Sequence, residues 1–348
     1  MTIRLLAAGD QFVLSDLLVD AVRGAAPDGI DIRQLSLPWP VEPFGPVAEV
    51  DEASGTEDEL IEALRGVHIC VTQMAPLTRR VLTAAPDLKL VCVTRGGPVN
   101  VNLEAATERG VAVCSAPGRN AAATAEHTLA MILAVVRRIP PIHQDLTSGV
   151  WRGDYYRYDS VGPELNGCTV GLVGFGAVGS RIARMLRGFD ARVLVYDPYV
   201  DQRQMPDIAE LTSLDDLLAR SSIVSLHARV TPETTKMIGA AQLALMPAGS
   251  IIVNCARAAL LDYDAVCDAL DSGHLFGAAF DVFPLEPIPA DSRLLRTHNI
   301  VMTPHLAGAS KQTATNAAHI AAGEVGRYLR GEPLHFCANP QAQRQVRT

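Results

Sequence analysis

The segment Thr169-Val-Gly-Leu-Val-Gly-Phe-Gly-Ala-Val-Gly179 decides the fold of this chain. Its spacing, Gly174-x-Gly176-x-x-Gly179, follows an apolar strand pattern and precedes a helical run at 180–186. In a dinucleotide-binding turn the first glycine permits the tight turn, the second lets the backbone approach a pyrophosphate, and the third allows the helix to pack closely on the strand. The alternative is a glycine-rich turn without a ligand. The strand, the helix and a downstream acid together favour a dinucleotide.

That acid is Asp197, which closes the strand pattern 192–196 and lies 21 residues after Gly176. A carboxylate at this distance accepts hydrogen bonds from the adenosine ribose hydroxyls and repels a 2′-phosphate, so the sequence predicts NAD as the cofactor. Because Arg203 lies a short distance further on, NADP stays an alternative cofactor. The residues expected to contact the cofactor here are Gly174, Phe175, Gly176, Ala177, Val178, Gly179 and Asp197.

Further strand patterns follow this turn and alternate with helical ones, which predicts a Rossmann-type doubly wound parallel sheet. Six patterns are strong and the one at 208–211 is weaker. The strong patterns span 169–173, 192–196, 223–227, 250–256, 277–281 and 299–303. We expect the cofactor domain to occupy residues 119–310.

The first third of the chain predicts a second α/β domain with a parallel sheet. A Pro-rich surface loop is expected at 38–52, and a helix at 121–138 that Pro140-Pro141 ends. A last helix at 311–329 could return to the first domain, which makes the expected substrate domain discontinuous, 1–118 and 311–348. The polar tail 341–348 is expected to be mobile. The strand patterns of this domain span 3–8, 30–37, 68–72, 88–94 and 111–114.

Composition narrows the class of protein. A chain of 348 residues favours two domains, and its net charge of −8 without a basic cluster argues against nucleic-acid binding. No apolar run is long enough to span a membrane, and the N-terminus predicts a strand and not a signal peptide, so we expect a cytoplasmic protein. The seven cysteines are expected to be reduced, and the absence of Cys-x-x-Cys and His-x-x-x-His spacing gives a metal site little support.

Three successive strand patterns end on residues that could carry chemistry. Arg257 follows 250–256, Asp281 and Glu286 follow the next strand, and His305 follows the last. Arginine can hold a carboxylate with two hydrogen bonds, histidine exchanges a proton near neutral pH, and a glutamate beside it can orient it. This set suits reduction of a 2-keto acid. Each residue alone could equally be structural.

Four blocks in one order resemble the D-isomer-specific 2-hydroxyacid dehydrogenases, and the likeness spans nearly the whole chain. The resemblance implies that Arg257, Glu286 and His305 are catalytic, and that Asp281 bonds the nicotinamide amide and His227 lies at the cofactor. It also implies a flavodoxin-like substrate domain and a homodimer. Glu286 separates the chain from formate dehydrogenases, which carry glutamine there. The blocks are 170–179, 254–262, 280–287 and 303–309.

Two departures from the family pattern bear on the substrate. Ala258 follows Arg257 where the family usually has glycine. The loop 95–102, which resembles a shortened form of the family's carboxylate-binding loop, keeps Gly96 and Gly97 as backbone donors to a substrate carboxylate. An ordinary turn after a strand is the alternative. The residues Gln73, Met74 and Asn100 are further candidates for the pocket wall.

The sequence therefore predicts hydride transfer between NAD(H) and a small 2-keto or D-2-hydroxy acid. Glyoxylate, hydroxypyruvate, 3-phosphoglycerate and sugar acids all stay open as substrates. The chain leaves no room for the regulatory domain of longer phosphoglycerate dehydrogenases, although short forms without it stay open. The alternative function is an NAD(H)-sensing binding protein or corepressor of the same fold with little turnover.

Overall fold

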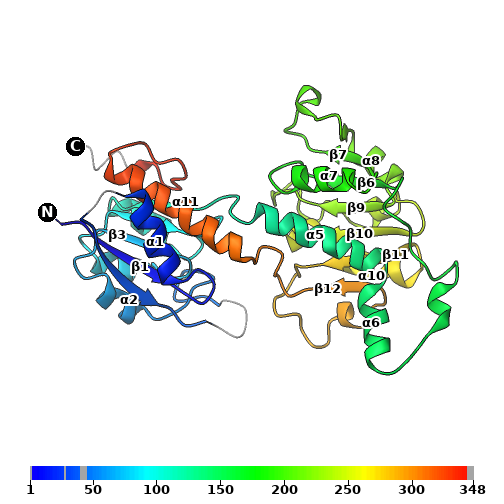
Figure 1. Cartoon of the computed structure of the whole chain (residues 1–348), viewed down its shortest axis with the longest axis horizontal. Helices are drawn as coiled ribbons and strands as arrows, with labels where there is room; N and C mark the ends of the chain where they lie inside the picture. The colour runs from blue at the N-terminus through cyan, green and yellow to red at the C-terminus, as the bar shows by residue number, and fades with distance from the viewer. Residues whose placement is uncertain (1, 27–28, 40–44, 343–348) are drawn as a thin grey trace. The chain divides into compact units, whose positions relative to one another are not determined.

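A computed structural model of the chain describes residues 2–26, 29–39 and 45–342 (Figure 1). The chain divides into two compact units, residues 1–120 with 309–348, and residues 121–308. Part of the Pro-rich loop 38–52 and most of the tail 341–348 lie outside the described residues. The described part of that loop forms only an isolated bridge between Val47 and Val50.

The first unit is a five-stranded parallel sheet in the order β2-β1-β3-β4-β5, which is the flavodoxin-like order that was expected. Its strands are β1 (Arg4–Gly9), β2 (Asp31–Ser36), β3 (Ile69–Thr72), β4 (Leu90–Val93) and β5 (Ala112–Cys114). Its helices are α1 (Ser15–Ala25), α2 (Glu57–Ala63), α3 (Arg79–Ala84), α4 (Leu103–Glu108) and α11 (Lys311–Leu329).

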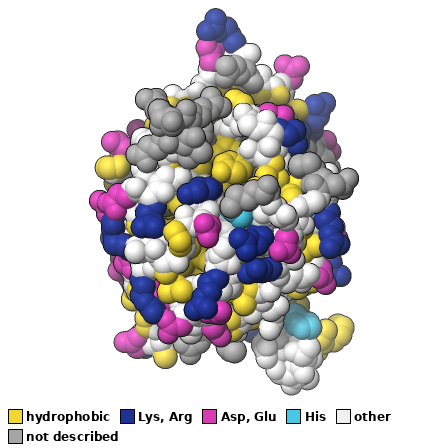
Figure 2. Space-filling model, turned by 90° about the vertical axis from the view of Figure 1, so that its left-hand side faces the viewer, with side chains coloured by type: hydrophobic (Ala, Val, Ile, Leu, Met, Phe, Trp, Pro, Cys, Tyr) yellow, Lys and Arg dark blue, Asp and Glu magenta, His cyan; other side chains and the backbone are white. Residues whose placement is uncertain are grey.

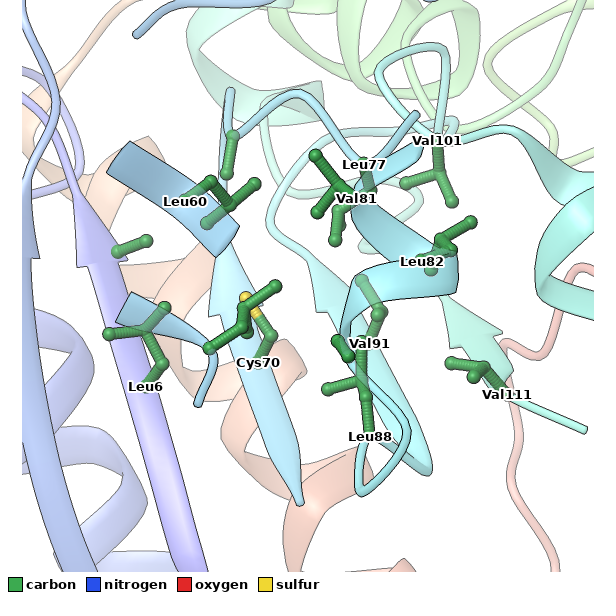
Figure 3. Packing of buried hydrophobic residues seen from close by; sticks show 14 of the residues in the cluster. Leu6, Leu60, Cys70, Leu77, Val81, Leu82, Leu88, Val91, Val101 and Val111 are labelled. Atoms are coloured by element: carbon green, nitrogen blue, oxygen red, sulfur yellow. The ribbon is translucent and has the colours of Figure 1, made fainter. Parts of the chain in front are cut away.

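Side chains alternate between the two faces of this sheet, and helices cover both faces. Leu6 and Ala8 of β1 pack with α2, α3 and the segment around Val101, and Figure 3 shows that cluster from close by. Leu5 and Ala7 face α1 and α11 on the other side. The alanines of α11 permit close approach, and a Cβ on Gly326 would lie 2.5 Å from the carbonyl oxygen of Ala25. The returning helix was predicted with these bounds.

The second unit is a seven-stranded parallel sheet in the order β12-β11-β10-β9-β6-β7-β8, the doubly wound Rossmann arrangement. The predicted fold class is therefore confirmed. Its strands are β6 (Thr169–Val173), β7 (Arg192–Tyr196), β8 (Glu210–Leu211), β9 (Ile223–Leu226), β10 (Ser250–Asn254), β11 (Leu275–Phe280) and β12 (Ile300–Met302).

Helices cover both faces of this sheet. The helix α5 (Ala121–Val136) packs with α7 (Gly179–Arg187) on one face, where Ala125, Ile132 and Val135 recur at helical spacing. The other face carries α8 (Leu214–Arg220), α9 (Ala240–Leu243) and α10 (Tyr263–Asp271). Short 3-10 turns lie at η1 (Gly153–Tyr156), η2 (Gln202–Gln204), η3 (Ala258–Leu260) and η4 (Arg293–Leu295).

One helix was not predicted. The sequence predicted that the helix starting at 121 continues to residue 138, whereas α5 ends at Val136 and Arg138 has left-handed backbone (φ 52°). A new helix, α6 (Ile139–Thr147), begins there, with proline in its first turn. Proline is favoured at that position because the N–H it lacks would have no helical partner. The Pro-Pro pair thus ends one helix and begins another.

One face of the molecule carries charged side chains of both signs. Figure 2 shows one face on which Lys and Arg side chains are interspersed with Asp and Glu and not gathered in one patch. Within the described ranges, no helix is both long and apolar enough to cross a membrane.

Candidate active site

The glycine turn after β6 has the geometry that a dinucleotide needs. Gly174 has φ +104°, and a Cβ there would lie 2.7 Å from the backbone of His227. A Cβ on Gly179 would lie 2.2 Å from the carbonyl oxygen of Gly174, so the start of α7 touches the end of β6. Gly176, by contrast, is exposed and faces open space. The three glycines thus provide the turn, the open approach and the close contact described above.

Asp197 is bound to this turn. Its Oδ2 accepts a hydrogen bond from the N–H of Phe175 at 2.8 Å, and its Oδ1 accepts from the N–H of Tyr199 at 2.9 Å. The carboxylate therefore fixes the turn, and each oxygen keeps a lone pair for a ribose hydroxyl. Next to the turn, Ala177 is exposed and Val178 precedes the first residue of α7.

His227 follows β9 and its backbone lies against Gly174. Burial lowers the pKa of His227 to about 3, so its imidazole is neutral at physiological pH. Its Nε2 is buried and has no partner among the described residues. An orphaned polar atom beside an open glycine turn and a helix N-terminus fits a site that takes a polar ligand such as NAD.

The three strands that lead to Arg257, Glu286 and His305 are adjacent in the sheet. The register pairs Asn254 of β10 with Phe280 of β11, and Phe280 with Met302 of β12. Because the strands are parallel, the segments that carry Arg257, Glu286 and His305 leave the same edge side by side.

Glu286 and His305 form a hydrogen-bonded pair. Oε2 of Glu286 lies 2.7 Å from Nδ1 of His305, and Oε1 accepts from the N–H of Phe283 at 2.9 Å. The side chain of His305 is 52% exposed, so the pair is open to solvent. With Nδ1 engaged, Nε2 of the imidazole is the nitrogen that can reach a substrate.

Asp281 organises the loop that carries His305. Its side chain is fully buried and accepts hydrogen bonds from the hydroxyl of Thr303 and from the N–H groups of Leu306 and Ala307, at 2.6 to 2.8 Å. His305 itself has left-handed backbone (φ 53°), which is costly for a residue with a side chain. Asp281 stabilises this conformation by binding the two residues that follow. Its predicted bond to a nicotinamide amide stays a prediction.

Arg257 is exposed and sits just before the turn η3, where Nη1 donates to the carbonyl of Ala256. Asn254 shapes this turn, because its amide donates to the carbonyl of Arg257 and its Oδ1 accepts from Ala256. The same amide lies 3.2 Å from the hydroxyl of Tyr263, which donates to the carbonyl of Val282 at 2.6 Å. A continuous chain of hydrogen bonds therefore links the arginine turn to the segment that leads to Glu286.

Asn254 and Tyr263 were not predicted as site residues. A signal was present, since Asn254 ends an otherwise apolar strand, and a buried amide in such a run requires partners. His127 of α5 was also missed, and its Nε2 lies 3.0 Å from the hydroxyl of Thr303. Nothing in the spacing of the sequence indicates that contact.

Gly96 and Gly97 lie in the other unit, after β4. Neither N–H donates a hydrogen bond to another described residue, and a Cβ on either glycine would meet nothing within 4 Å. Met74 is buried in the core, and Asn100 donates to the carbonyl of Ala75. Among the described residues, no cluster of His, Cys, Asp or Glu side chains is suited to hold a metal ion.

The chain is similar to several known proteins. Residues 129–307 match the family model described as D-isomer specific 2-hydroxyacid dehydrogenase, NAD binding domain. The chain is 34% identical to a D-3-phosphoglycerate dehydrogenase of Archaeoglobus fulgidus, over 84% of this chain but 55% of that relative, so it spans about half of the relative's length. It is also 34% identical to a glyoxylate reductase of Korarchaeum cryptofilum, over 81% of this chain and 86% of the relative. A crystal structure of a Thermus thermophilus protein matches with a TM-score of 0.77 at 30% identity, covering 97% of this chain and all of that one.

Proposed function

The chain belongs to the D-isomer-specific 2-hydroxyacid dehydrogenase family, with the family's NAD-binding domain at residues 129–307, and we propose that it transfers a hydride between NAD(H) and a small 2-keto or D-2-hydroxy acid. The single observation that carries the proposal is the hydrogen bond of 2.7 Å between Glu286 and His305, at a strand edge shared with Arg257. In this assignment the unit of residues 121–308 binds the cofactor and the other unit binds the substrate.

The cofactor is held by the turn after β6. The N–H groups at the start of α7 bind the pyrophosphate, Gly176 allows its approach, and Asp197 accepts hydrogen bonds from the ribose. Asp281 lies at the same edge, where it bonds the nicotinamide amide, and His227 contacts the bound cofactor beside Gly174. When bound, NADH supplies the hydride that reduces the keto carbon.

The protein supplies the anchor and the proton. Arg257 offers its planar guanidinium to the substrate carboxylate. In the other unit, the N–H groups of Gly96 and Gly97 are the candidate donors to a carboxylate. The protonated His305 donates its Nε2 proton to the oxygen that becomes the hydroxyl, and Glu286 holds Nδ1 and balances the imidazolium charge. In the reverse direction the neutral imidazole takes the proton from the hydroxy acid.

We propose a homodimer, supported by a group of large apolar side chains on and after α6. Trp151, Tyr156 and Tyr158 are 87%, 94% and 97% exposed, and Ile139 and Leu146 are about half exposed. Such a concentration of exposed apolar surface marks an interface. A groove of about 500 Å³ lined by residues of α5, α6 and β12, the edge strand of the sheet, adjoins it. A second copy of the chain is the occupant we assign.

We also propose a cytoplasmic location, supported by the five cysteines that lie buried in the core as reduced thiols.

The catalytic proposal is tested by mixing the protein with NADH and a panel of 2-keto acids and following NADH oxidation. Saturable turnover of at least one acid is expected. Tight NADH binding without turnover of any acid would favour a cofactor-sensing protein instead.

A further inference from the structure

The five-stranded sheet has one place where ligands are expected to bind. Its strand order reverses between β1 and β3, and in open α/β sheets ligands bind beyond the carboxyl ends of the strands at such a reversal. Asp10, Gln73 and Thr94 follow β1, β3 and β4 at this edge. The register aligns Ala8 with Thr72, and Thr72 with Val93, so the three residues leave the sheet side by side.

All three residues carry a buried polar atom without a partner. Their side chains are 5%, 4% and 0% exposed, and Oδ2 of Asp10, Oε1 of Gln73 and Oγ1 of Thr94 have no hydrogen-bond partner among the described residues. A buried polar atom that stays unpaired destabilises the protein, so a ligand that pairs it is favoured. Oδ1 of Asp10 is by contrast used, because it accepts from the N–H groups of Phe12 and Val13 at 2.7 and 2.8 Å.

Arg119, which follows β5, adds a donor to this group. Its Nη1 is also buried without a partner, and its guanidinium lies 5.8 Å from the ring centroid of Phe12. Burial lowers the pKa of Arg119 to about 10, and its charge acts on both Asp10 and Arg95. Arg95 is ion-paired with Glu52. Two arginines therefore face two carboxylates, and the formal charges of the group sum to zero.

The glycines that lie beside this group in the chain leave open space around their backbone. A Cβ on Gly96, Gly97 or Gly118 would meet no atom within 4 Å, although these glycines flank Arg95 and Arg119 in the chain. We propose that Asp10, Gln73, Thr94 and Arg119 form a subsite for hydroxyl groups on the substrate beyond its keto carbon, so that the protein selects hydroxylated 2-keto and 2-hydroxy acids. The proposal rests on the proposed function and adds the substrate class.

The hydrogen-bond donors and acceptors of the subsite determine which class of substrate fits it. A hydroxyl group donates one hydrogen bond and also accepts, so it can donate to the acceptor of Asp10 or of Gln73 and at the same time accept from Arg119. A phosphate dianion only accepts hydrogen bonds, and it would add negative charge beside Asp10 in a group that is already balanced. An alkyl side chain would leave all four atoms unpaired, which is the situation in which sites reject a substrate most strongly.

The test compares three acids of equal chain length in NADH-dependent reduction: hydroxypyruvate, pyruvate and 3-phosphohydroxypyruvate. We expect kcat/KM for hydroxypyruvate to exceed both others by roughly 10-fold or more. Gln73→Met keeps the size of the side chain and removes the amide, so it should lower kcat/KM for hydroxypyruvate by roughly 10-fold and change that for pyruvate little. Asp10→Asn keeps the Oδ1 acceptor for the backbone and should have a similar selective effect. Gln34→Met, at an exposed position of β2, is the matched control.

Binding separates this proposal from the proposed function. Calorimetric titration of the protein and NADH with D-glycerate should give tighter binding than with D-lactate, and Gln73→Met should remove the difference. That result without turnover of any acid would keep the subsite and contradict the dehydrogenase. Similar kcat/KM for all three keto acids, unchanged selectivity in Gln73→Met, or equal binding of the two hydroxy acids would overturn the subsite while any turnover kept the dehydrogenase.

Discussion

Oε2 of Glu286 and Nδ1 of His305 lie 2.7 Å apart, although 19 residues separate them in the chain. The parallel pairing of β11 with β12 makes this contact possible, because it brings the segments after both strands to one edge. Glu286 is itself fixed by the N–H of Phe283, so the imidazole is held from a rigid support.

Glu286→Gln keeps a side chain that can hydrogen-bond to His305 but removes the negative charge. We expect an active enzyme with a lower kcat and unchanged NADH affinity. The loss arises because the imidazolium of the proton donor has no carboxylate to balance its charge. Steady-state kinetics at saturating NADH measure kcat. A kcat equal to that of the parent enzyme would mean that Glu286 does not act on the proton donor.

Asp197→Asn removes the charge that faces the ribose and keeps an acceptor for the N–H of Phe175. We expect the preference for NADH over NADPH to shrink by roughly 10-fold, because a 2′-phosphate is no longer repelled. Fluorescence titration with each cofactor measures the two affinities, and Asp207→Asn at an exposed position is the control. Tighter binding of NADPH than of NADH by the parent protein would contradict the assignment.

Arg257→Ala should raise KM for the keto acid by roughly 10- to 100-fold, since a hydrogen-bonded charge on the carboxylate is lost. NADH affinity should stay the same, and Arg184→Ala, on the exposed side of α7, should behave like the parent. Steady-state kinetics at varied keto acid concentration provide the measurement. An unchanged KM would place the carboxylate elsewhere.

The fold could be predicted from the sequence because its signals are local. The short apolar and β-branched runs of the strands, the glycine spacing of 174–179 and the alanine-rich helix Lys311–Leu329 each identify an element without knowledge of the rest. The helix α6 was missed because the Pro-Pro pair was interpreted only as the end of α5. A proline pair can end the helix before it or stand in the first turn of the helix after it, and the sequence was compatible with both.

The residue types of the candidate site could be predicted from the sequence, but the hydrogen bonds between these residues could not. Arg257, Glu286 and His305 stand directly after strands, where the topology alone places them together. The bonds of Asn254 to the arginine turn, and of Asp281 to the loop of His305, join residues through backbone groups that have no sequence signature. The sequence likewise gave no indication that His127 contacts Thr303.

The burial of His227 should make the stability of the folded protein depend on pH. Burial lowers its pKa from 6.5 to about 3, so between these values the unfolded chain binds a proton that the folded chain does not. Stability is therefore lost as the pH falls from about 6.5 toward 3, by up to about 1.4 kcal/mol per pH unit. Urea unfolding at pH 7.5 and 5.5 measures the loss, which His227→Gln should reduce and the exposed control His143→Gln should not. Equal losses in parent and His227→Gln would exclude this origin.

The most direct test of the account is the turnover of His305→Asn with NADH and a keto acid that the parent protein reduces. Asparagine preserves a polar side chain at the loop but cannot donate a proton to the forming alkoxide. We predict a kcat lower by roughly 10²- to 10⁴-fold, with NADH affinity and thermal stability close to those of the parent. A kcat near the parent value in a folded, NADH-binding His305→Asn protein would contradict the proposed mechanism.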